Sequence, residues 1–198
     1  MPNVSPLASL HRHFEGKLRF SRKRVSMMLR SEVFVLLAPG FEEADVSTVT
    51  RTLRQSGLPV AVVGLTAGPI RGNYGLSLAP DMPFSEVEAA SPKAVVLPGG
   101  VQGAKRLNAE PRVHALLRQV VSRGGYVVAL DAAYTVLRSA GLLDKAGKWP
   151  AEMPVIRWCG EGPLSGRVVV EGPVVFGRDS GAAQESALTL LALLEGRR

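Results

Sequence analysis

Four short apolar runs constrain the fold of this chain more strongly than any other feature. They are VFVLLA (33–38), PVAVVGL (59–65), KAVVLPGG (93–100) and YVVAL (126–130). Continuous rather than alternating apolar sequence is typical of strands that are buried on both faces of a sheet. Three of the runs lead directly into Pro, Gly or Asp residues. We therefore expect buried strands whose ends carry turns or chemical groups.

Segments with helical periodicity lie between these runs. The first extends from Glu42 to about Gln55, and others are expected after Pro111, from Asp131 to about Ser139, and over about 181–195. LSLAP suggests a short edge strand, and RVVV with PVVFG suggests a late pair of strands. Alternation of strands and helices predicts an α/β fold with a mainly parallel sheet and helices on both faces.

Composition indicates one soluble domain with a basic extension. The chain has 198 residues, of which 46% are hydrophobic and 21% charged, and it lacks the long apolar run of a membrane span. Residues 1–30 hold seven of the 24 Lys and Arg but only one acid, Glu15. We expect them to be a disordered extension, or to precede a true start at Met27 or Met28; the alternatives are a basic arm that binds nucleic acid or anionic lipid, and a targeting peptide. The remainder, 31–198, is nearly neutral, which argues against nucleic-acid binding by the domain.

The residues at three strand ends resemble those of a known family. LLAPGFEEADV, AVVLPGG and VVALDAAYTVLRSAGLL are similar to the signature segments of the ThiJ/PfpI family. That superfamily contains the parkinsonism-associated deglycase, PfpI-type intracellular proteases and stress chaperones, with class I glutamine amidotransferase domains as distant relatives. The resemblance implies a flavodoxin-like three-layer sandwich and a homodimer or larger homo-oligomer.

The resemblance also implies roles for individual residues. In the family, an acid on the first helix hydrogen-bonds a cysteine thiolate at a strand-to-helix elbow, beside backbone N–H groups that form an anion hole. These roles fall on Asp45 for the helix acid, on Gly99 and Gly100 of the PGG turn, and on Ala132 after the elbow. The elbow position itself is Asp131. Tyr134 and Trp149 are expected to narrow the pocket.

Neither the thiol nor the histidine of the family is present at the matching positions. Ala132 and Trp149 stand where the histidine would be, and His114 falls on a helix elsewhere. The single cysteine, Cys159, lies well beyond the elbow, and we read it as a small, partly buried residue. We therefore expect no cysteine-dependent peptidase, deglycase or glyoxalase activity, and no metal or cofactor.

Three interpretations of Asp131 remain open. The pocket could be non-catalytic, retained for binding a small molecule or for a stress response, in a cytoplasmic protein. Asp45 and Asp131 could instead form an acid–base pair acting as a hydratase or lyase on a small carbonyl compound, because two close carboxyls can share one proton and raise one pKa. Asp131 could also imitate an oxidised cysteine. The simplest alternative to any site is that Asp131 merely caps its helix.

Overall fold

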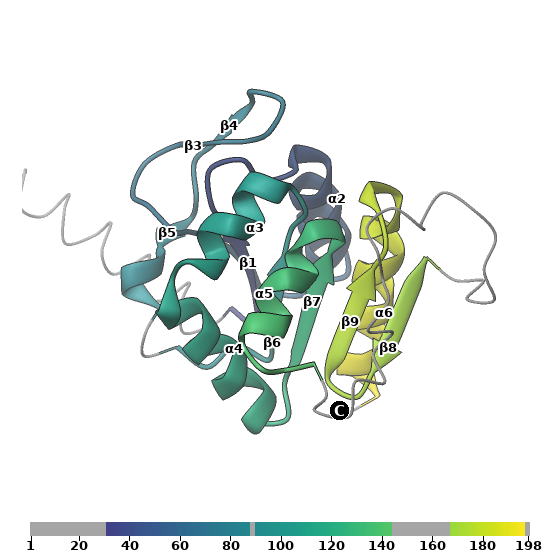
Figure 1. Cartoon of the computed structure of the whole chain (residues 1–198). Helices are drawn as coiled ribbons and strands as arrows, with labels where there is room; N and C mark the ends of the chain where they lie inside the picture. The colour runs from purple at the N-terminus through teal and green to yellow at the C-terminus, as the bar shows by residue number, and fades with distance from the viewer. Residues whose placement is uncertain (1–30, 88–89, 144–166, 197–198) are drawn as a thin grey trace, which may run out of the picture.

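The structure is a computed structural model that describes residues 31–87, 90–143 and 167–196 (Figure 1). A seven-stranded sheet lies at its centre, in the order β5-β2-β1-β6-β7-β9-β8. Neighbouring strands are parallel except for the antiparallel pair β8 and β9. The strands are β1 (Val33–Leu37), β2 (Val60–Gly64), β5 (Met82–Pro83), β6 (Ala94–Leu97), β7 (Tyr126–Leu130), β8 (Val168–Glu171) and β9 (Val174–Gly177).

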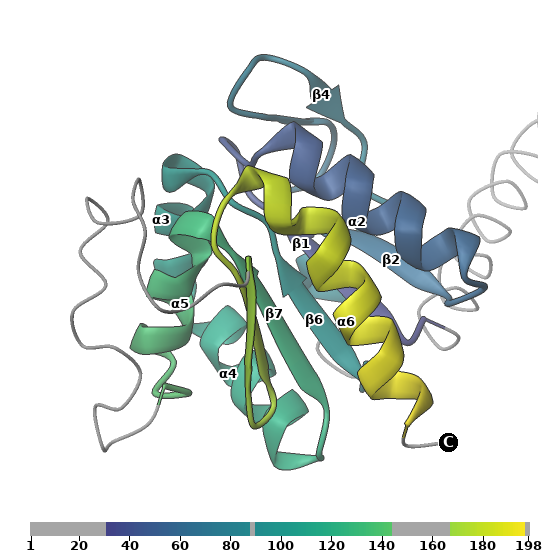
Figure 2. The same ribbon diagram turned by 90° about the vertical axis from the view of Figure 1, so that its right-hand side faces the viewer.

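Helices cover both faces of this sheet, as Figure 2 shows. On one face α2 and α6 lie side by side over the core cluster that contains Val35 and Val128. On the other face α3, α4 and α5 pack over the cluster that contains Phe34 and Val127. The helices are α2 (Glu43–Gln55), α3 (Val101–Asn108), α4 (Pro111–Ser122), α5 (Tyr134–Ser139) and α6 (Ala183–Glu195). The molecule therefore has the three layers of a flavodoxin-like α/β fold.

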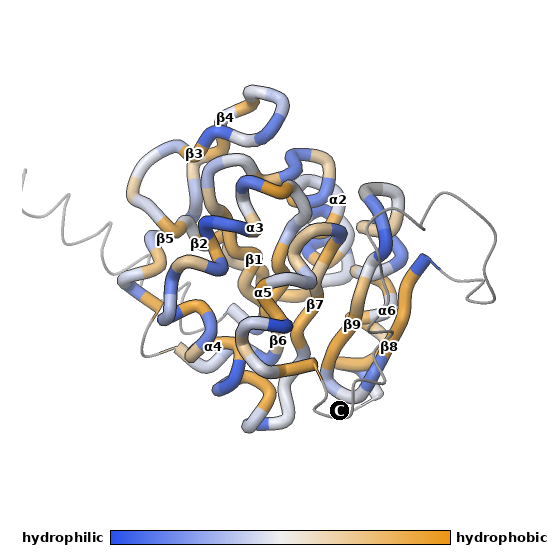
Figure 3. Tube along the Cα trace, viewed as in Figure 1, coloured by the Kyte–Doolittle hydropathy of each residue, from blue (hydrophilic) through white to orange (hydrophobic). Residues whose placement is uncertain are grey.

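The central strands are buried along their whole length. All five residues of β1, β2 and β7 are buried, as the continuous apolar runs predict. Figure 3 shows these strands as the hydrophobic interior of the domain. Successive side chains of a strand point to opposite faces of the sheet, so each central strand contributes to both core clusters. Removal of either helical layer would therefore expose apolar side chains of these strands.

Two elements differ from the expectations. The LSLAP segment does not join the main sheet, because β4 (Ser77–Leu78) pairs with β3 (Ile70–Arg71) in a separate antiparallel hairpin that projects beyond the sheet. Helix α3 begins directly after the PGG turn and has no strong sequence signal, since Gly103 weakens helix propensity. A Cβ at Gly103 would stand 3.0 Å from the Gly40 carbonyl oxygen, so close packing requires this glycine.

The sheet order places a site at one edge. The chain passes from β1 to β2 on one side and then returns to β6 on the other side of β1. At such a reversal the turns after the two strands diverge, and ligands of open α/β sheets bind there. The turns at this edge follow β1, β6 and β7. Within the described residues, no helix is both long and apolar enough to cross a membrane.

Candidate functional site

Asp45 is a buried carboxylate in the first turn of α2. Its side chain is 0% exposed, and its Oδ2 accepts a hydrogen bond of 2.8 Å from the backbone N–H of Gly99. Its Oδ1 is also buried and accepts no hydrogen bond. An unpaired acceptor in the interior loses its hydration without compensation, which is uncommon for a purely structural residue.

Burial controls the protonation of Asp45. It raises the pKa of this carboxyl to about 7, and the hydrogen bond from Gly99 opposes the shift. The charges of Glu42, Asp131 and Asp179 add smaller upward contributions, in that order. The raised pKa expected for the carboxylate pair therefore falls on Asp45, but desolvation is its main cause rather than repulsion by Asp131. Near neutral pH both protonation states are populated.

Asp131 occupies a strained turn at the end of β7. It begins a short 3-10 turn (Asp131–Ala133) that leads into α5, and its φ of 44° is the only positive value among the described non-glycine residues. Its side chain is exposed, and Asp131 is the N-cap neither of the 3-10 turn nor of α5, because Leu130 and Ala133 occupy those positions. The structure therefore does not support the alternative that Asp131 merely caps its helix. The carboxylate is open to water rather than shielded with Asp45.

The PGG turn brings Asp45 and Asp131 together. A Cβ placed on Gly99 would lie 2.7 Å from Asp45 Oδ2 and 3.3 Å from Asp131 Cβ. Gly100 has a φ of 98°, and a Cβ there would lie 2.4 Å from the Gly40 carbonyl oxygen. Only glycine fits this approach of the β6 turn to the β1 turn.

The two expected anion-hole donors, Gly100 and Ala132, differ in burial, since Gly100 is buried and Ala132 half-buried. No described acceptor receives the backbone N–H of Gly100 or of Ala132. Both residues border the point where Asp45 and Asp131 converge. The geometry therefore combines two N–H donors with two carboxylates of different exposure.

Glu42 is a site residue that the sequence reasoning did not single out. The acids of the GFEE segment fit a helix N-terminus, which conceals any other role. Glu42 is half-buried, makes no capping hydrogen bond through its side chain, and donates its N–H to the Gly99 carbonyl oxygen at 2.9 Å. The pKa of Glu42 is raised mainly by burial, and the charges of Glu43 and Asp131 add smaller upward effects, with Asp131 the smallest. A side-chain hydrogen bond with Asn73 lowers it.

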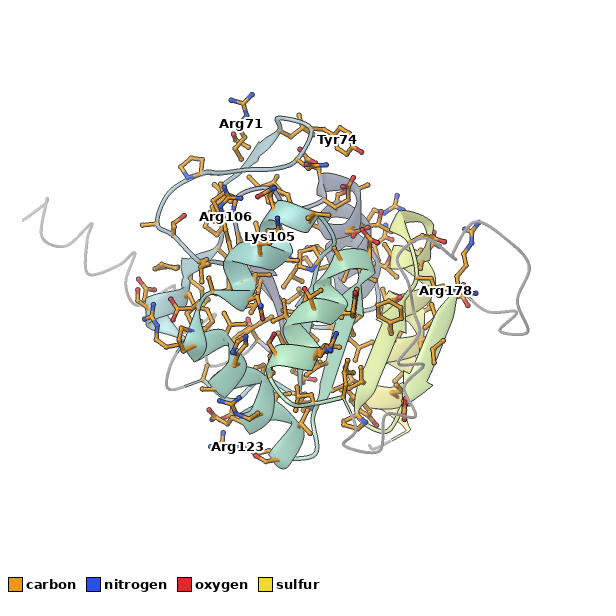
Figure 4. The ribbon with its side chains drawn as sticks, viewed as in Figure 1. Arg71, Tyr74, Lys105, Arg106, Arg123 and Arg178 are labelled. Atoms are coloured by element: carbon orange, nitrogen blue, oxygen red, sulfur yellow. The ribbon has the colours of Figure 1, made fainter. Side chains whose placement is uncertain are left out.

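Glu43 supports the hairpin beside the site. Its Oε1 accepts hydrogen bonds from the N–H groups of Tyr74 at 2.8 Å and Leu76 at 3.2 Å. A cavity of about 550 Å³ lies between this turn and α2. Figure 4 shows Arg71 and Tyr74 on the projecting hairpin and Lys105 and Arg106 on α3.

The remaining candidate residues are distributed as follows. Tyr134 is half-buried and packs edge-to-face on Phe176 of β9, with ring centroids 6.3 Å apart. His114 lies on α4, where its Nε2 is 3.0 Å from Asn108 Oδ1. Trp149 and Cys159 lie outside the described residues, so their expected roles stay predictions. No group of three or more potential metal ligands occurs among the described residues.

Comparison with known proteins identifies the family. The sequence profile described as the DJ-1/PfpI family matches residues 31–193. The chain belongs to the DJ-1/PfpI family. It is 31% identical over 172 residues to Protein dj-1beta of Drosophila melanogaster, an alignment that covers 85% of this chain and 92% of that protein. The basic segment 1–30 lies outside the family match.

Other DJ-1/PfpI relatives carry names that state an activity. A glutathione-independent glyoxalase of Caenorhabditis elegans is 29% identical over 174 residues, covering 86% of this chain and 92% of the glyoxalase. A deglycase of Thermococcus kodakarensis is 27% identical over 153 residues, an alignment that covers 76% of this chain and 91% of the deglycase.

Solved structures of the family have the same fold. A cysteine-to-alanine mutant of a DJ-1 superfamily protein from Salmonella typhimurium superposes with a TM-score of 0.70 at 31% identity, covering 84% of this chain and 91% of that one. Oxidised DJ-1 of Toxoplasma gondii superposes with a TM-score of 0.71 at 28% identity, covering 82% of this chain and 89% of that one.

Proposed function

We propose that this DJ-1/PfpI protein binds a small molecule at the Asp131 turn and does not carry out thiol chemistry there. The observation that carries the proposal is the identity and setting of residue 131. A strained turn presents an exposed carboxylate where the family places a cysteine. A carboxylate is a weak nucleophile toward carbonyl carbon without an activating base, and no histidine follows the elbow.

The surroundings of Asp131 support ligand binding. The N–H groups of Gly100 and Ala132 lack described acceptors, and Asp45 Oδ1 is buried without a partner. Leaving these groups unpaired costs folding free energy, because each loses hydration when the chain folds. A ligand that pairs them would stabilise the folded state in proportion to its concentration above Kd.

Two measurements test this proposal. The purified full-length chain should not consume methylglyoxal above the rate in buffer. Asp131→Cys is the matched variant, because it restores a thiol beside Asp45 and should gain this activity. Amide NMR of the wild type should show small polar molecules shifting the signals of Gly99, Gly100 and Ala132. Thiol-independent turnover of methylglyoxal would overturn the non-catalytic part, and unmoved amides with every compound would overturn binding.

A second candidate is acid–base chemistry by Asp45 and Asp131. The observation that favours it is the pKa of about 7 at Asp45, which lets this carboxyl both give and accept a proton at neutral pH. Dehydration of a β-hydroxy carbonyl compound begins when a base removes a proton from the carbon next to the carbonyl group, and hydroxide then leaves as water; the reverse hydration ends with the return of that proton. Proton–deuterium exchange of hydroxyacetone, followed by NMR, should then be accelerated by the wild type and not by Asp45→Asn.

The proposal includes a cytoplasmic protein of the stress-response type that forms a homo-oligomer. A single cysteine in the whole chain supports a reducing compartment, where disulfides are rare. Tyr74 and Leu76 are 77% and 65% exposed on one hairpin, and large exposed apolar side chains that cluster favour association. Light scattering of the wild type and of Leu76→Asp should give an oligomeric and a smaller mass, respectively. An unchanged monomeric mass would contradict this part.

A further inference from the structure

A second cavity lies at the end of the sheet opposite to the candidate site. It has a volume of about 290 Å³ and is bordered by the segments that lead into β6 and β7 and by the last turn of α6. Its wall has a buried part, formed by Pro92, Tyr126 and Leu194, and an exposed polar part, formed by Ser91, Lys93 and Arg123. An apolar wall with a few polar groups is the usual form of a small-molecule site. No described lining residue belongs to the candidate site, so this cavity is a separate feature.

One edge of the Arg123 guanidinium group is available to a ligand. Its Nη1 donates to the Ser91 hydroxyl. Nη1 and Nη2 both donate to the Gln119 amide oxygen, at 2.9 and 3.1 Å, in the amide orientation that satisfies both side chains. Among the described residues, no acceptor pairs with Nε–H or with the remaining N–H of Nη2. These two N–H groups are parallel, and such a pair matches the two oxygens of a carboxylate.

The charge of Arg123 is not compensated by any carboxylate in the part of the chain that the structure describes. Arg54 and Arg112, by contrast, form ion pairs with acidic side chains, at 2.7 and 2.8 Å. The guanidinium group of Arg123 contacts the neutral side chains of Ser91 and Gln119. An anion at this position would therefore supply a missing opposite charge.

Arg123 is also not required to complete the end of α4. Arginine side chains near a helix C-terminus often bind the last carbonyl oxygens. Here the carbonyl oxygens of Gln119 and Val120 accept the backbone N–H of Arg123, both at 3.2 Å. The carbonyl oxygen of Val121 accepts the N–H of Gly124 at 2.9 Å. Backbone groups thus cap the helix, and the guanidinium group is left for another partner.

The charges at the cavity favour a ligand with a single negative charge. Lys93 Nζ lies 3.0 Å from Glu32 Oε2, and this pair leaves further ammonium N–H groups for another acceptor. Glu32 offsets one of the two cationic side chains, so the described lining and its ion-pair partner carry one net positive charge. A carboxylate balances that charge, whereas a phosphate monoester exceeds it.

We propose that this cavity binds a small monocarboxylate with a short apolar body, such as a short-chain fatty acid. The two carboxylate oxygens accept the parallel Nε–H and Nη2–H of Arg123, and Lys93 adds a second favourable charge. The carbon chain lies against the buried wall of the cavity and loses its contact with water there. The site goes beyond the proposed function, because it uses no residue of the Asp131 turn.

Amide NMR titration of the full-length protein with four probes tests this proposal. Butanoate has the carboxylate and the chain, acetate lacks most of the chain, butanamide lacks the charge, and butyl phosphate has a second negative charge at about pH 8. Butanoate should shift the signals of Gly124, Gly125 and Tyr126 and leave those of Gly99 and Gly100 unchanged. It should bind about threefold more tightly than acetate and about tenfold more tightly than butanamide.

Three outcomes of the titration would overturn the proposal. Equal binding of butanoate and butanamide would show that the carboxylate is not recognised. Tighter binding of butyl phosphate than of butanoate would refute the assignment of a monoanion. Unchanged signals of Gly124 and Gly125 with every probe would refute the site, while ligand binding at the Asp131 turn would be unaffected.

Variants of the charged residues test the geometry. Arg123→Gln should weaken butanoate binding about tenfold, and Arg123→Lys, which keeps the charge without the parallel N–H pair, should restore only part of it. Glu32→Gln should strengthen binding, because it removes a negative charge beside Lys93. Melting temperatures show whether each variant is folded.

Lys105→Gln is the matched control for Arg123→Gln. It also removes one positive charge, but from α3 at the opposite end of the molecule in Figure 4, so the affinity for butanoate should not change. If both variants weakened butanoate equally, the binding would reflect net charge alone, and the assignment to Arg123 would be wrong.

Discussion

Asp45 and Asp131 converge on Gly99, although one is fully buried and the other exposed. Asp45 Oδ2 and Asp131 Cβ lie 2.7 Å and 3.3 Å from the position that a Cβ on Gly99 would take. Burial is the main cause of the raised pKa of Asp45. Any function of the site must use them in different ways.

Asp45→Asn should remove a pH dependence of stability. The folded-state pKa of about 7 exceeds the ordinary aspartate pKa of 3.8, so between these pH values the folded state binds more protons than the unfolded state. The free energy of unfolding of the wild type should therefore fall as pH rises from about 4 to 7.5, by up to about 4 kcal/mol relative to the variant. Urea denaturation across this pH range measures the difference. If the free energy of unfolding changed with pH equally in the wild type and the variant, burial would not raise the pKa of Asp45.

Asp131→Asn should change the titration of Asp45 only slightly. Burial is the largest cause of the raised pKa, and Asp131 contributes less than burial and Glu42 do. The pKa of Asp45 should thus fall a little but stay well above its ordinary value. Carboxyl-carbon NMR titration of wild type and variant measures it. A return to about 4 would instead establish that the two acids share a proton.

Replacement of Asp131 by Gly and by Ala should reveal the strain of its turn. Both variants lose the carboxylate, but a Cβ is unfavourable at a φ of 44° and glycine is not. Asp131→Gly should therefore be more stable than Asp131→Ala by about 1 kcal/mol. At Arg51, exposed within α2, the same pair should have the opposite order by about 1 kcal/mol. Urea denaturation of the four variants tests for this reversal of sign.

Gly100→Ala should destabilise the domain more than Gly57→Ala. Both glycines have positive φ, 98° and 81°. At Gly57 nothing lies within 4 Å of an added Cβ, so only the backbone cost of about 1 kcal/mol applies. At Gly100 the added Cβ would meet the Gly40 carbonyl oxygen at 2.4 Å, which adds roughly 1–3 kcal/mol. Equal losses in thermal unfolding would show that the two turns can separate without cost.

Deletion of residues 1–30 should leave the stability of the domain nearly unchanged. The segment is strongly basic, lacks apolar periodicity and lies outside the family match of 31–193. The melting temperature should change by less than about 2 °C, which corresponds to less than 1 kcal/mol for a domain of this size. A drop of many degrees would mean that the segment packs on the domain.

The main strands and most helices could be predicted from the sequence because their apolar patterns match their periods. VFVLLA and YVVAL became β1 and β7, and Val46, Val49 and Leu53 lie on the buried face of α2 as expected. Helix α3 could not be predicted, because Gly103 is a poor helix residue locally. Its presence follows from packing against the Gly40 turn, where a larger residue would clash.

The sequence by itself determined the layered fold and the edge of the sheet where Asp45 and Asp131 would meet, because strand and helix periods and the order of strand ends are local properties. Only the tertiary structure decided that Asp45 is buried and Asp131 exposed, and that Glu42 joins them at Gly99. Burial depends on which elements of the whole chain cover a side chain, and the pKa of a carboxyl follows that burial. Two aspartates that are identical in the sequence therefore differ in the folded protein.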